Sequence, residues 1–211
     1  MKKHLLIYGT ENYKNSINSL IKSSNNFFDE HHILSPSNIN QDFYNKNKNI
    51  LDLKLGAGYF LWKPYIIYET LKKINDGDII FYVDAGNIFI NNPNFLYEKL
   101  EENNGIILFD NRDGMNNGES AQNFISCKKD SFILMGCDTD KYIFGKHLNA
   151  SYQIYQKNDF SLLFVSDYKE CPLIGQDYYI IPRTILTLPA VNFIAAVSTY
   201  VPFYQLGIQI C

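Results

Sequence analysis

The stretch Asp78-Ile79-Ile80-Phe81-Tyr82-Val83-Asp84-Ala85-Gly86 carries the strongest information about the fold of this chain. Its apolar run does not alternate with polar residues, which is typical of a parallel strand buried on both faces, so we predict a central strand over residues 78–83. Asp84 stands where that strand stops. In open α/β sheets, ligands bind beyond the carboxyl ends of the strands, where a carboxylate can hold Mg²⁺ or Mn²⁺ beside substrate phosphates. Gly86 allows a pyrophosphate to approach the backbone closely.

An aspartate at the end of a strand has a second interpretation, because Asp is also common as a turn residue or helix cap. The preceding segment, residues 56–67, strengthens the prediction of a site. There a flexible Gly-Ala-Gly turn leads into a helix that contains Pro64 in its first turn, and the free N–H groups of a helix start attract anions. Lys63 adds a full positive charge. The alternative for this segment is a hydrophobic staple with Trp62 in the core.

On either side of this stretch, short apolar runs alternate with segments of helical periodicity. Such alternation predicts a layered α/β fold with a mostly parallel central sheet. A polar, Asn-rich stretch over residues 38–49 and a polar, Gly-rich stretch over residues 110–120 are expected to be surface loops. Besides the central strand, the expected strands are 4–8, 32–34, 105–109 and 150–155, and the expected helices are 17–21, 62–74, 95–101, 128–135 and 160–168.

Composition narrows the class of protein further. The chain has 211 residues and 46% hydrophobic residues, which is enough for one globular domain spanning residues 1–211. A net charge of −3 without a basic run argues against a nucleic-acid partner. The four cysteines lack C-x-x-C spacing, and the apolar run near the N-terminus is too short for an export signal. We therefore expect a cytoplasmic protein.

Two segments together resemble a known family. Gly56-Ala57-Gly58-Tyr59-Phe60-Leu61-Trp62-Lys63-Pro64-Tyr65, followed one helix later by residues 78–86, is similar to the hallmark of glycosyltransferases with a GT-A-type fold. That hallmark is Gly-x-Gly-Tyr-aromatic-x-Trp-Lys-Pro and then a strand with Tyr-x-Asp-Ala-Gly. Leu6-Ile7-Tyr8-Gly9-Thr10 looks like the family's first strand and donor-binding loop, and the likeness continues to about Cys171.

The resemblance implies transfer of a sugar from a nucleoside-diphosphate sugar to a glycan or lipid-linked acceptor, as in bacterial capsule or other surface-polysaccharide biosynthesis. It places a divalent cation, Mn²⁺ or Mg²⁺, at Asp84. It assigns no catalytic residue. Donor binding is expected at Tyr8, Thr10, Gly58, Trp62, Lys63, Asp84 and Gly86.

The chain departs from the family in two places. Asp84-Ala85-Gly86 takes the position of the Asp-x-Asp metal motif but has one carboxylate, and Asp110 or Asp113 is a candidate for the second; both, with Ser151, are also candidates for the acceptor side. Residues 171–211 lack the His/Arg-rich segment of the family, so this tail is atypical and consistent with truncation relative to the family. The tail has no charge after Arg183, and the alternatives for it are a buried segment and contact with a membrane.

Two other functions remain open at this point. The missing carboxylate and the atypical tail are also compatible with a catalytically degenerate protein that binds nucleotide sugars. A haloacid dehalogenase-like phosphotransferase also uses a strand-terminal aspartate as its nucleophile, but that class has a second aspartate where this chain has Gly86.

Overall fold

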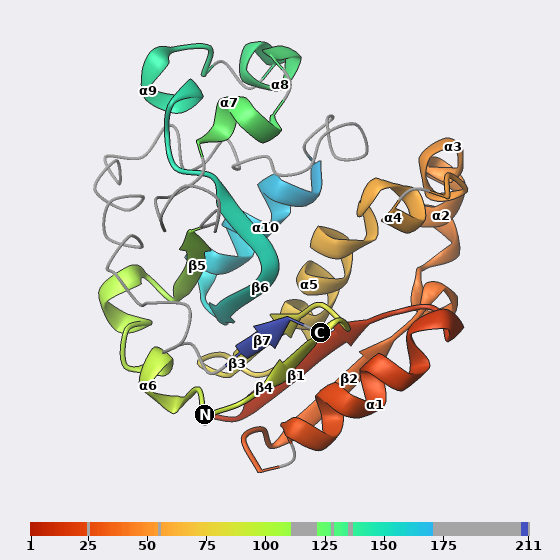
Figure 1. The fold of residues 1–211 in the computed structure, drawn as a ribbon, viewed down its shortest axis with the longest axis vertical. Coiled ribbons are helices and arrows are strands. Elements are labelled where there is room, and N and C mark those ends of the chain that lie inside the picture. Colours follow the sequence, from red (N-terminus) through yellow and green to blue (C-terminus); the bar gives the residue numbers. More distant parts are fainter. Residues whose placement is uncertain are drawn as a thin grey trace.

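The computed structural model describes residues 1–24, 26–54, 56–110, 122–127, 129–134, 137–170 and 208–210. Strands and helices alternate along most of this part of the chain (Figure 1). The strands are β1 (Lys3–Tyr8), β2 (Glu30–Leu34), β3 (Ile79–Val83), β4 (Asn87–Phe89), β5 (Ile106–Asp110), β6 (Leu148–Gln156) and β7 (Ile208–Ile210). The helices are α1 (Lys14–Ser23), α2 (Gln41–Lys46), α3 (Lys48–Leu51), α4 (Gly56–Tyr59), α5 (Trp62–Lys73), α6 (Asn94–Tyr97), α7 (Asn123–Ser126), α8 (Lys129–Leu134), α9 (Asp140–Ile143) and α10 (Asp159–Glu170), with 3₁₀ turns at Glu11–Tyr13, Pro36–Asn38 and Glu101–Asn103.

A five-stranded sheet in the order β2-β1-β3-β6-β5 forms the centre of the fold. β1 pairs in parallel with β2 and with β3, whereas β6 runs antiparallel to both of its neighbours. Four of the five strands therefore point in one direction, and the predicted α/β class with a mostly parallel sheet is confirmed. The reversal of β6 is not visible in the sequence, because a strand buried on both faces reads the same in either direction.

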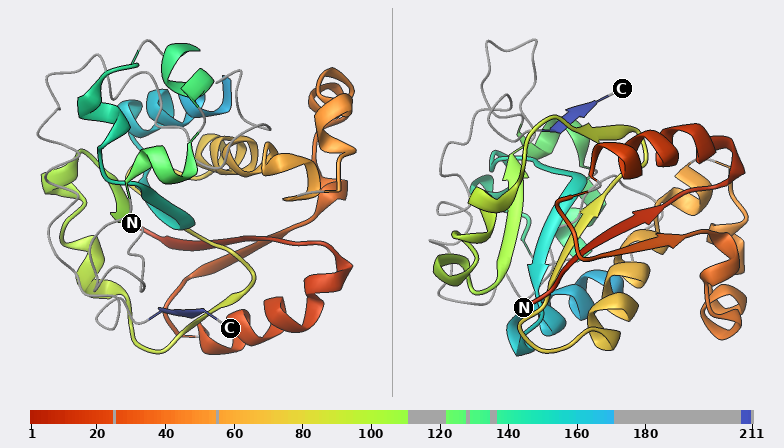
Figure 2. Two further views of the ribbon diagram at one scale, coloured as in Figure 1. Left: turned by 45° about the horizontal axis from the view of Figure 1, so that its top comes forward. Right: turned by 90° about the horizontal axis from the view of Figure 1, so that it is seen from below.

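The central strand β3 is buried along its whole length, since both faces of the sheet are covered. On one face, Phe81 packs with Leu5 and Leu20 in a cluster beneath α1. On the other face, Tyr82 packs with Ile66 of α5, in the cluster that also holds side chains of α10. Figure 2 shows these layers, with α5 and α10 on one side of the sheet and α1 on the other. The uninterrupted apolar run of the sequence reflects this double coverage.

One predicted loop is wrong. Residues 41–46 and 48–51, which cover most of the Asn-rich stretch 38–49 that was expected to be a surface loop, form α2 and α3. The side chain of Asn40 caps α2 by accepting a hydrogen bond from the backbone N–H of Asp42 at 2.8 Å. Phe43 then stacks on Tyr65 of α5 with ring centroids 4.0 Å apart. Asparagine favours helix caps as well as loops, and composition alone does not separate these two uses.

The predicted strands and helices agree with the structure within a few residues, except that the predicted helix 95–101 is shorter and is followed by a 3₁₀ turn. The predicted loop over residues 110–120 lies outside the described residues, apart from Asp110. Within the described part of the chain, no helix is both long and apolar enough to cross a bilayer. Asp113 and most of the 171–211 tail lie outside the described residues. From that tail, the structure describes β7, which pairs antiparallel with β4.

Candidate active site

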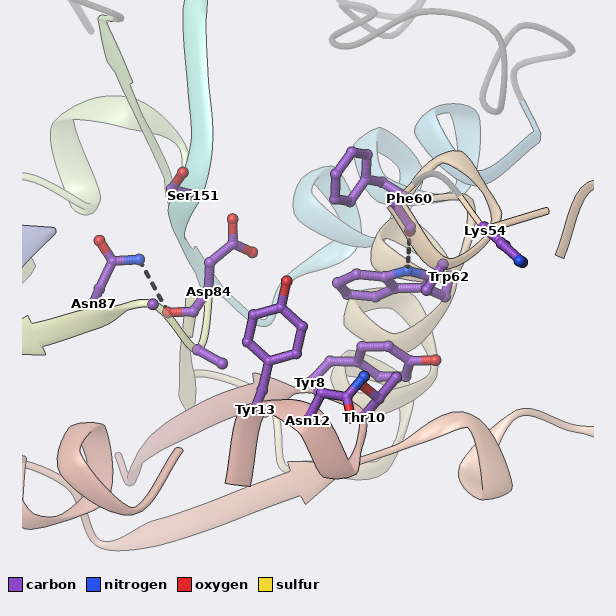
Figure 3. Close-up of a pocket in the computed structure, with 15 residues that line it drawn as sticks. Tyr8, Thr10, Asn12, Tyr13, Lys54, Phe60, Trp62, Asp84, Asn87 and Ser151 are labelled. Carbon is purple, nitrogen blue, oxygen red and sulfur yellow. Dashed lines mark hydrogen bonds between the residues drawn. The ribbon is translucent and has the colours of Figure 1, made fainter. Parts of the chain in front are cut away.

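A pocket of about 640 Å³ opens where β1 and β3 end, beside the turn that leads into α5. Figure 3 shows its lining side chains, which come from the loop after β1, the α3–α5 connection, the segment after β3 and strand β6. They are Tyr8, Gly9, Thr10, Asn12, Tyr13, Lys54, Gly56, Ala57, Phe60, Trp62, Asp84, Ala85, Gly86, Asn87 and Ser151. The pocket therefore lies at the edge of the sheet where ligands bind in open α/β folds.

Asp84 lies in this pocket and is anchored by an ion pair with the buried ammonium of Lys63. Nζ of Lys63 is 3.0 Å from Oδ1 and 3.3 Å from Oδ2 of Asp84, and it also donates to the backbone carbonyl of Ala150 at 3.1 Å. The hydroxyl of Tyr82 donates to Oδ1. The side chain of Lys63 is 4% exposed and that of Asp84 is 32% exposed. Asp84 thus presents a fixed carboxylate to the pocket, with Lys63 behind it.

Lys63 reaches Asp84 through a group of aromatic rings. Its Nζ lies 5.3 Å from the ring centroid of Phe60, 5.7 Å from that of Trp62 and 5.0 Å from that of Tyr82. These distances permit cation–π attraction, which partly compensates for the loss of water around the ammonium. Lys63 is not among the residues that line the pocket, and its ammonium contacts the carboxylate of Asp84.

The turn before α5 is tighter than the sequence suggested. Ala57 and Phe60 adopt left-handed backbone angles with φ of 50° and 62°, alongside Gly56 and Gly58. Two non-glycine residues in this region store roughly 1–2 kcal/mol each. A Cβ atom on Gly58 would lie 2.6 Å from Cα of Leu51, so Gly58 serves close backbone packing and does not line the pocket.

Two backbone N–H groups at the start of α5, where the sequence predicted an anion site, are used within the turn. The N–H of Leu61 donates to the carbonyl of Gly58, and that of Lys63 donates to the carbonyl of Phe60. Trp62 also contributes to the turn, because its Nε1–H donates to the carbonyl of Gly56 at 3.1 Å. The N–H groups of Leu61 and Lys63 are therefore not available to a ligand.

Two aromatic rings form a stacked pair at the pocket. Tyr8 and Trp62 lie with centroids 3.8 Å apart and planes 17° apart, and each residue is 6% exposed. Burial raises the pKa of the Tyr8 hydroxyl to about 12, so the phenol is neutral at physiological pH. Tyr8 is thus a core aromatic as well as a pocket residue, and Trp62 already covers one of its faces.

The structure brings five of the seven predicted donor-binding residues to the pocket wall: Tyr8, Thr10, Trp62, Asp84 and Gly86. Gly58 and Lys63 stand behind the wall. Ser151, which the sequence suggested only as an acceptor-side residue, also lines the pocket, and its carbonyl accepts the N–H of Asp84 at 2.7 Å. Asp110 ends β5, and its side chain lies outside the described part of the structure.

Several lining side chains were not predicted from the sequence, among them Tyr13, Lys54 and Asn87. Tyr13 is 52% exposed, and Figure 3 shows it pointing into the space between Asp84 and Trp62. Lys54 is exposed and forms no ion pair with the described residues. Asn87 donates through Nδ2 to the carbonyl of Asp84, while its Oδ1 is buried without a hydrogen-bond partner among the described residues. Each of them is within three residues of Thr10, Gly56 or Asp84, and this closeness in sequence could have indicated that they belong to the pocket.

No protein-family model matches the sequence, and no curated protein matches it. Among solved structures, the galactosyltransferase LgtC, in complex with donor and acceptor sugar analogues, is similar to 98% of this chain over 86% of its own, with 10% identity and a TM-score of 0.50. The bifunctional glycosyltransferase WbbM is similar to 92% of this chain over 37% of its own, with 10% identity and a TM-score of 0.47.

Core-mannan synthase A from Aspergillus fumigatus, in an Mn/GDP form, is similar to 87% of this chain over 68% of its own, with 11% identity and a TM-score of 0.43. Because the TM-scores for WbbM and core-mannan synthase A are below 0.5, the likeness in fold depends on LgtC alone. At 10% identity that likeness concerns the fold alone. The described chain therefore has an α/β fold that resembles a GT-A-type glycosyltransferase domain.

Proposed function

We propose that this protein is a glycosyltransferase that moves a sugar from a nucleoside-diphosphate sugar to a glycan or lipid-linked acceptor. The observation that carries the proposal is Asp84, fixed by Lys63 and presented to a pocket at the carboxyl ends of β1 and β3. A GT-A-like fold favours this function over a haloacid dehalogenase-like phosphotransferase. A place in the cytoplasm and in polysaccharide biosynthesis belongs to the same proposal.

The charges around the pocket favour an anionic donor. Among the described residues, Lys54 and Asp84 are the charged ones that line it, and Lys63 lies behind Asp84, which leaves one net positive charge. A diphosphate is attracted to such a site, and Lys54 has its ammonium available for it. A Cβ atom on Gly86 would meet nothing within 4 Å, so the backbone there leaves open space beside Asp84.

The aromatic residues near β1 suit a nucleobase. Tyr13 offers a ring that is 52% exposed, and the stacked pair of Tyr8 and Trp62 forms a rigid wall next to it. Thr10 supplies a hydroxyl at the same wall. We propose that Tyr13 stacks on the base and that Tyr8 and Trp62 hold the shape of this end of the pocket.

A divalent cation, Mn²⁺ or Mg²⁺, fits the oxygen atoms near Asp84. The Asp84 carboxylate is partly exposed, and Ser151 lines the pocket beside it. Hard cations prefer such oxygen ligands and usually bind one or two carboxylates plus substrate phosphates. When bound, the ion would neutralise charge on the leaving diphosphate.

In the proposed reaction, the bond between the anomeric carbon and the donor diphosphate breaks, and a bond forms between that carbon and an acceptor oxygen. The acceptor hydroxyl loses its proton, and the nucleoside diphosphate leaves with the electron pair of the broken bond. Lys54 stabilises the negative charge that develops on the leaving group. No described residue is assigned as the base.

The proposal is tested by thermal unfolding of the full chain with a panel of nucleotide sugars, with and without Mn²⁺, followed by assays of donor hydrolysis and transfer. A matching donor should raise Tm by binding the native state. Asp84→Asn should abolish this shift and reduce turnover at least about 100-fold. Leu71→Ala, a core change away from the pocket with a comparable loss of stability, should keep the shift.

Two results would contradict the proposal. A donor-induced shift without any hydrolysis or transfer would favour the degenerate nucleotide-sugar-binding protein. Unchanged turnover in Asp84→Asn would remove Asp84 from the reaction.

A further inference from the structure

Three side chains with metal-ligating atoms lie together where β1 and β2 begin, at the ends of the strands opposite the pocket. They are His4, Glu30 and His32. β1 and β2 are parallel, and His4 is opposite Glu30 in their register. Residues two apart on a strand share a face, so all three side chains project from the same face of the sheet. This cluster is separate from the pocket, which lies at the other ends of the same strands.

The distances within this His4–Glu30–His32 cluster suit one metal ion. Nδ1 of His4 is 3.0 Å from Nε2 of His32 and 3.4 Å from Oε2 of Glu30, and the three ligand atoms all lie within 4.8 Å of one another. Ligands of a tetrahedral zinc ion, at about 2.0–2.2 Å from the metal, are separated by roughly 3.3 Å. The observed spacing therefore allows binding with small side-chain adjustments.

The other ring nitrogen of His4 supports this inference independently. The His4 side chain is 4% exposed, and its Nε2 is buried without a hydrogen-bond partner among the described residues, 3.6 Å from Oδ2 of Asp78. A proton on Nε2 is favoured there because it faces a carboxylate, and this tautomer directs the Nδ1 lone pair at the cluster. Histidine ligands of metals are commonly oriented by a carboxylate in this way.

Glu30 is oriented by Lys2 in a manner that leaves one oxygen for a metal. Nζ of Lys2 donates to Oε1 at 2.6 Å, whereas Oε2 is the atom that faces His4. The Glu30 side chain is 43% exposed, so water can reach the cluster and complete the coordination. Two imidazoles and one carboxylate favour zinc or a similar transition metal over Mg²⁺ or Ca²⁺.

We propose that His4, Glu30 and His32 bind one Zn²⁺ ion, with Asp78 and Lys2 orienting the ligands. The bound ion joins β1 to β2 at the amino-terminal edge of the sheet. It stabilises the native state because the unfolded chain does not hold these residues together. This site does not depend on the proposed glycosyltransferase activity.

The test uses the full chain, freed of metal with a chelator and then titrated with Zn²⁺ or Co²⁺. At zinc concentrations about a hundredfold above Kd, Tm should rise by roughly 5–10 °C. One equivalent of Co²⁺ should give the visible absorption of a tetrahedral site, without the near-ultraviolet band of thiolate ligands. His32→Gln should lose both signals. The matched control is His31→Gln, because His31 is on the opposite face of β2 and contacts Ser24.

The variant Asp84→Asn should keep the zinc response, which separates this cluster from the pocket. Circular dichroism without metal checks that His32→Gln folds; if it does not, Glu30→Gln replaces it, because the Glu30 side chain is more exposed. An unchanged response in the folded ligand variant, or loss of the response in His31→Gln, overturns the proposal. So does the absence of any zinc-induced shift or cobalt spectrum in the unaltered chain, which would mean that the two imidazoles are only hydrogen-bonded.

Discussion

Strand β3 has an aspartate at each end, and the two carboxylates have different environments. By the two edges of the sheet we mean the side where β1 and β3 begin and the side where they end. Asp78, before the strand, is 5% exposed and accepts the backbone N–H of Lys2 at 2.6 Å, a bond that holds its pKa below the ordinary value. Asp84, after the strand, is 32% exposed and is held by a side-chain ammonium. The carboxylate of Asp78 is buried and accepts a backbone hydrogen bond, whereas part of the Asp84 carboxylate is open to a ligand.

The contrast shows how exposure separates structural from functional carboxylates beside one strand. A carboxylate that is bonded to the backbone and buried stabilises the fold. A carboxylate that is fixed by a buried lysine, yet open on one side, is oriented and still able to bind. Three sets of substitutions test this contrast, in order of decreasing effect on stability.

The greatest loss is expected at the pocket edge. Asp84→Asn leaves the ammonium of Lys63 buried without its carboxylate, and we expect a loss of about 3 kcal/mol in the free energy of unfolding. Lys63→Met should cost less, roughly 1–2 kcal/mol, because water can solvate Asp84 from the pocket. The double variant should be more stable than Asp84→Asn alone. Urea denaturation of the unaltered chain, the two single variants and the double variant measures the coupling between Lys63 and Asp84. If the loss in the double variant equals the sum of the two single losses, the predicted coupling is absent.

A control for this set of variants is available on the same helix. Lys72 pairs with Glu69 at the surface, with 50% and 30% of their side chains exposed. Exposed pairs contribute about 0–1 kcal/mol, so Lys72→Met should have little effect. A loss as large as that of Asp84→Asn would mean that any lysine of α5 matters equally.

An intermediate effect is expected at the other edge. Asp78→Asn weakens the charge-assisted bond with the N–H of Lys2, and we expect a loss of about 2 kcal/mol, measured by urea denaturation in the presence of a chelator. Adding Lys63→Met to Asp78→Asn should give the sum of the single losses, because these residues lie at opposite edges of the sheet. Coupling between the two edges would contradict their separation.

Backbone strain should give the weakest effects, with opposite signs at the two edges. Ala57 at the pocket has φ of 50°, so Ala57→Gly should stabilise the chain by about 1 kcal/mol. Gly77 at the other edge has φ of 82°, and although an added Cβ atom would meet nothing within 4 Å, Gly77→Ala should destabilise the chain by about 1 kcal/mol. Chemical denaturation distinguishes these cases. Equal signs would mean that the turn before α5 is not strained.

Features that depend only on residues close together in the sequence could be predicted from it. Strand β3 and the position of Asp84 at its end follow from an apolar run and its last residue. Contacts that depend on tertiary structure were not predictable. Lys63 and Asp84 are 21 residues apart and meet only because α5 packs on β3, and the His4–Glu30–His32 cluster requires the register of β1 against β2. The direction of β6 also depends on a connection that the apolar pattern does not encode.

Lys63 is a useful example of this limit, because its contact with Asp84 could not be predicted from the sequence. A lysine at a predicted helix start was expected to face a phosphate. In the structure, the helix turns Lys63 inward to Asp84, and Lys54, which precedes the turn, supplies the exposed charge. Which of two nearby lysines faces a pocket depends on the path of the turn between them.

The partial burial of the Lys63–Asp84 pair has a consequence for the dependence of this protein on ionic strength. Salt screens exposed charges over a Debye length of about 8 Å at physiological concentration, but it acts much less on buried or partly buried pairs. Lys54 is exposed, so its attraction for an anion weakens as salt is added, whereas the contact between Lys63 and Asp84 persists. Raised salt should therefore slow the capture of an anionic ligand while the carboxylate of Asp84 keeps its orientation.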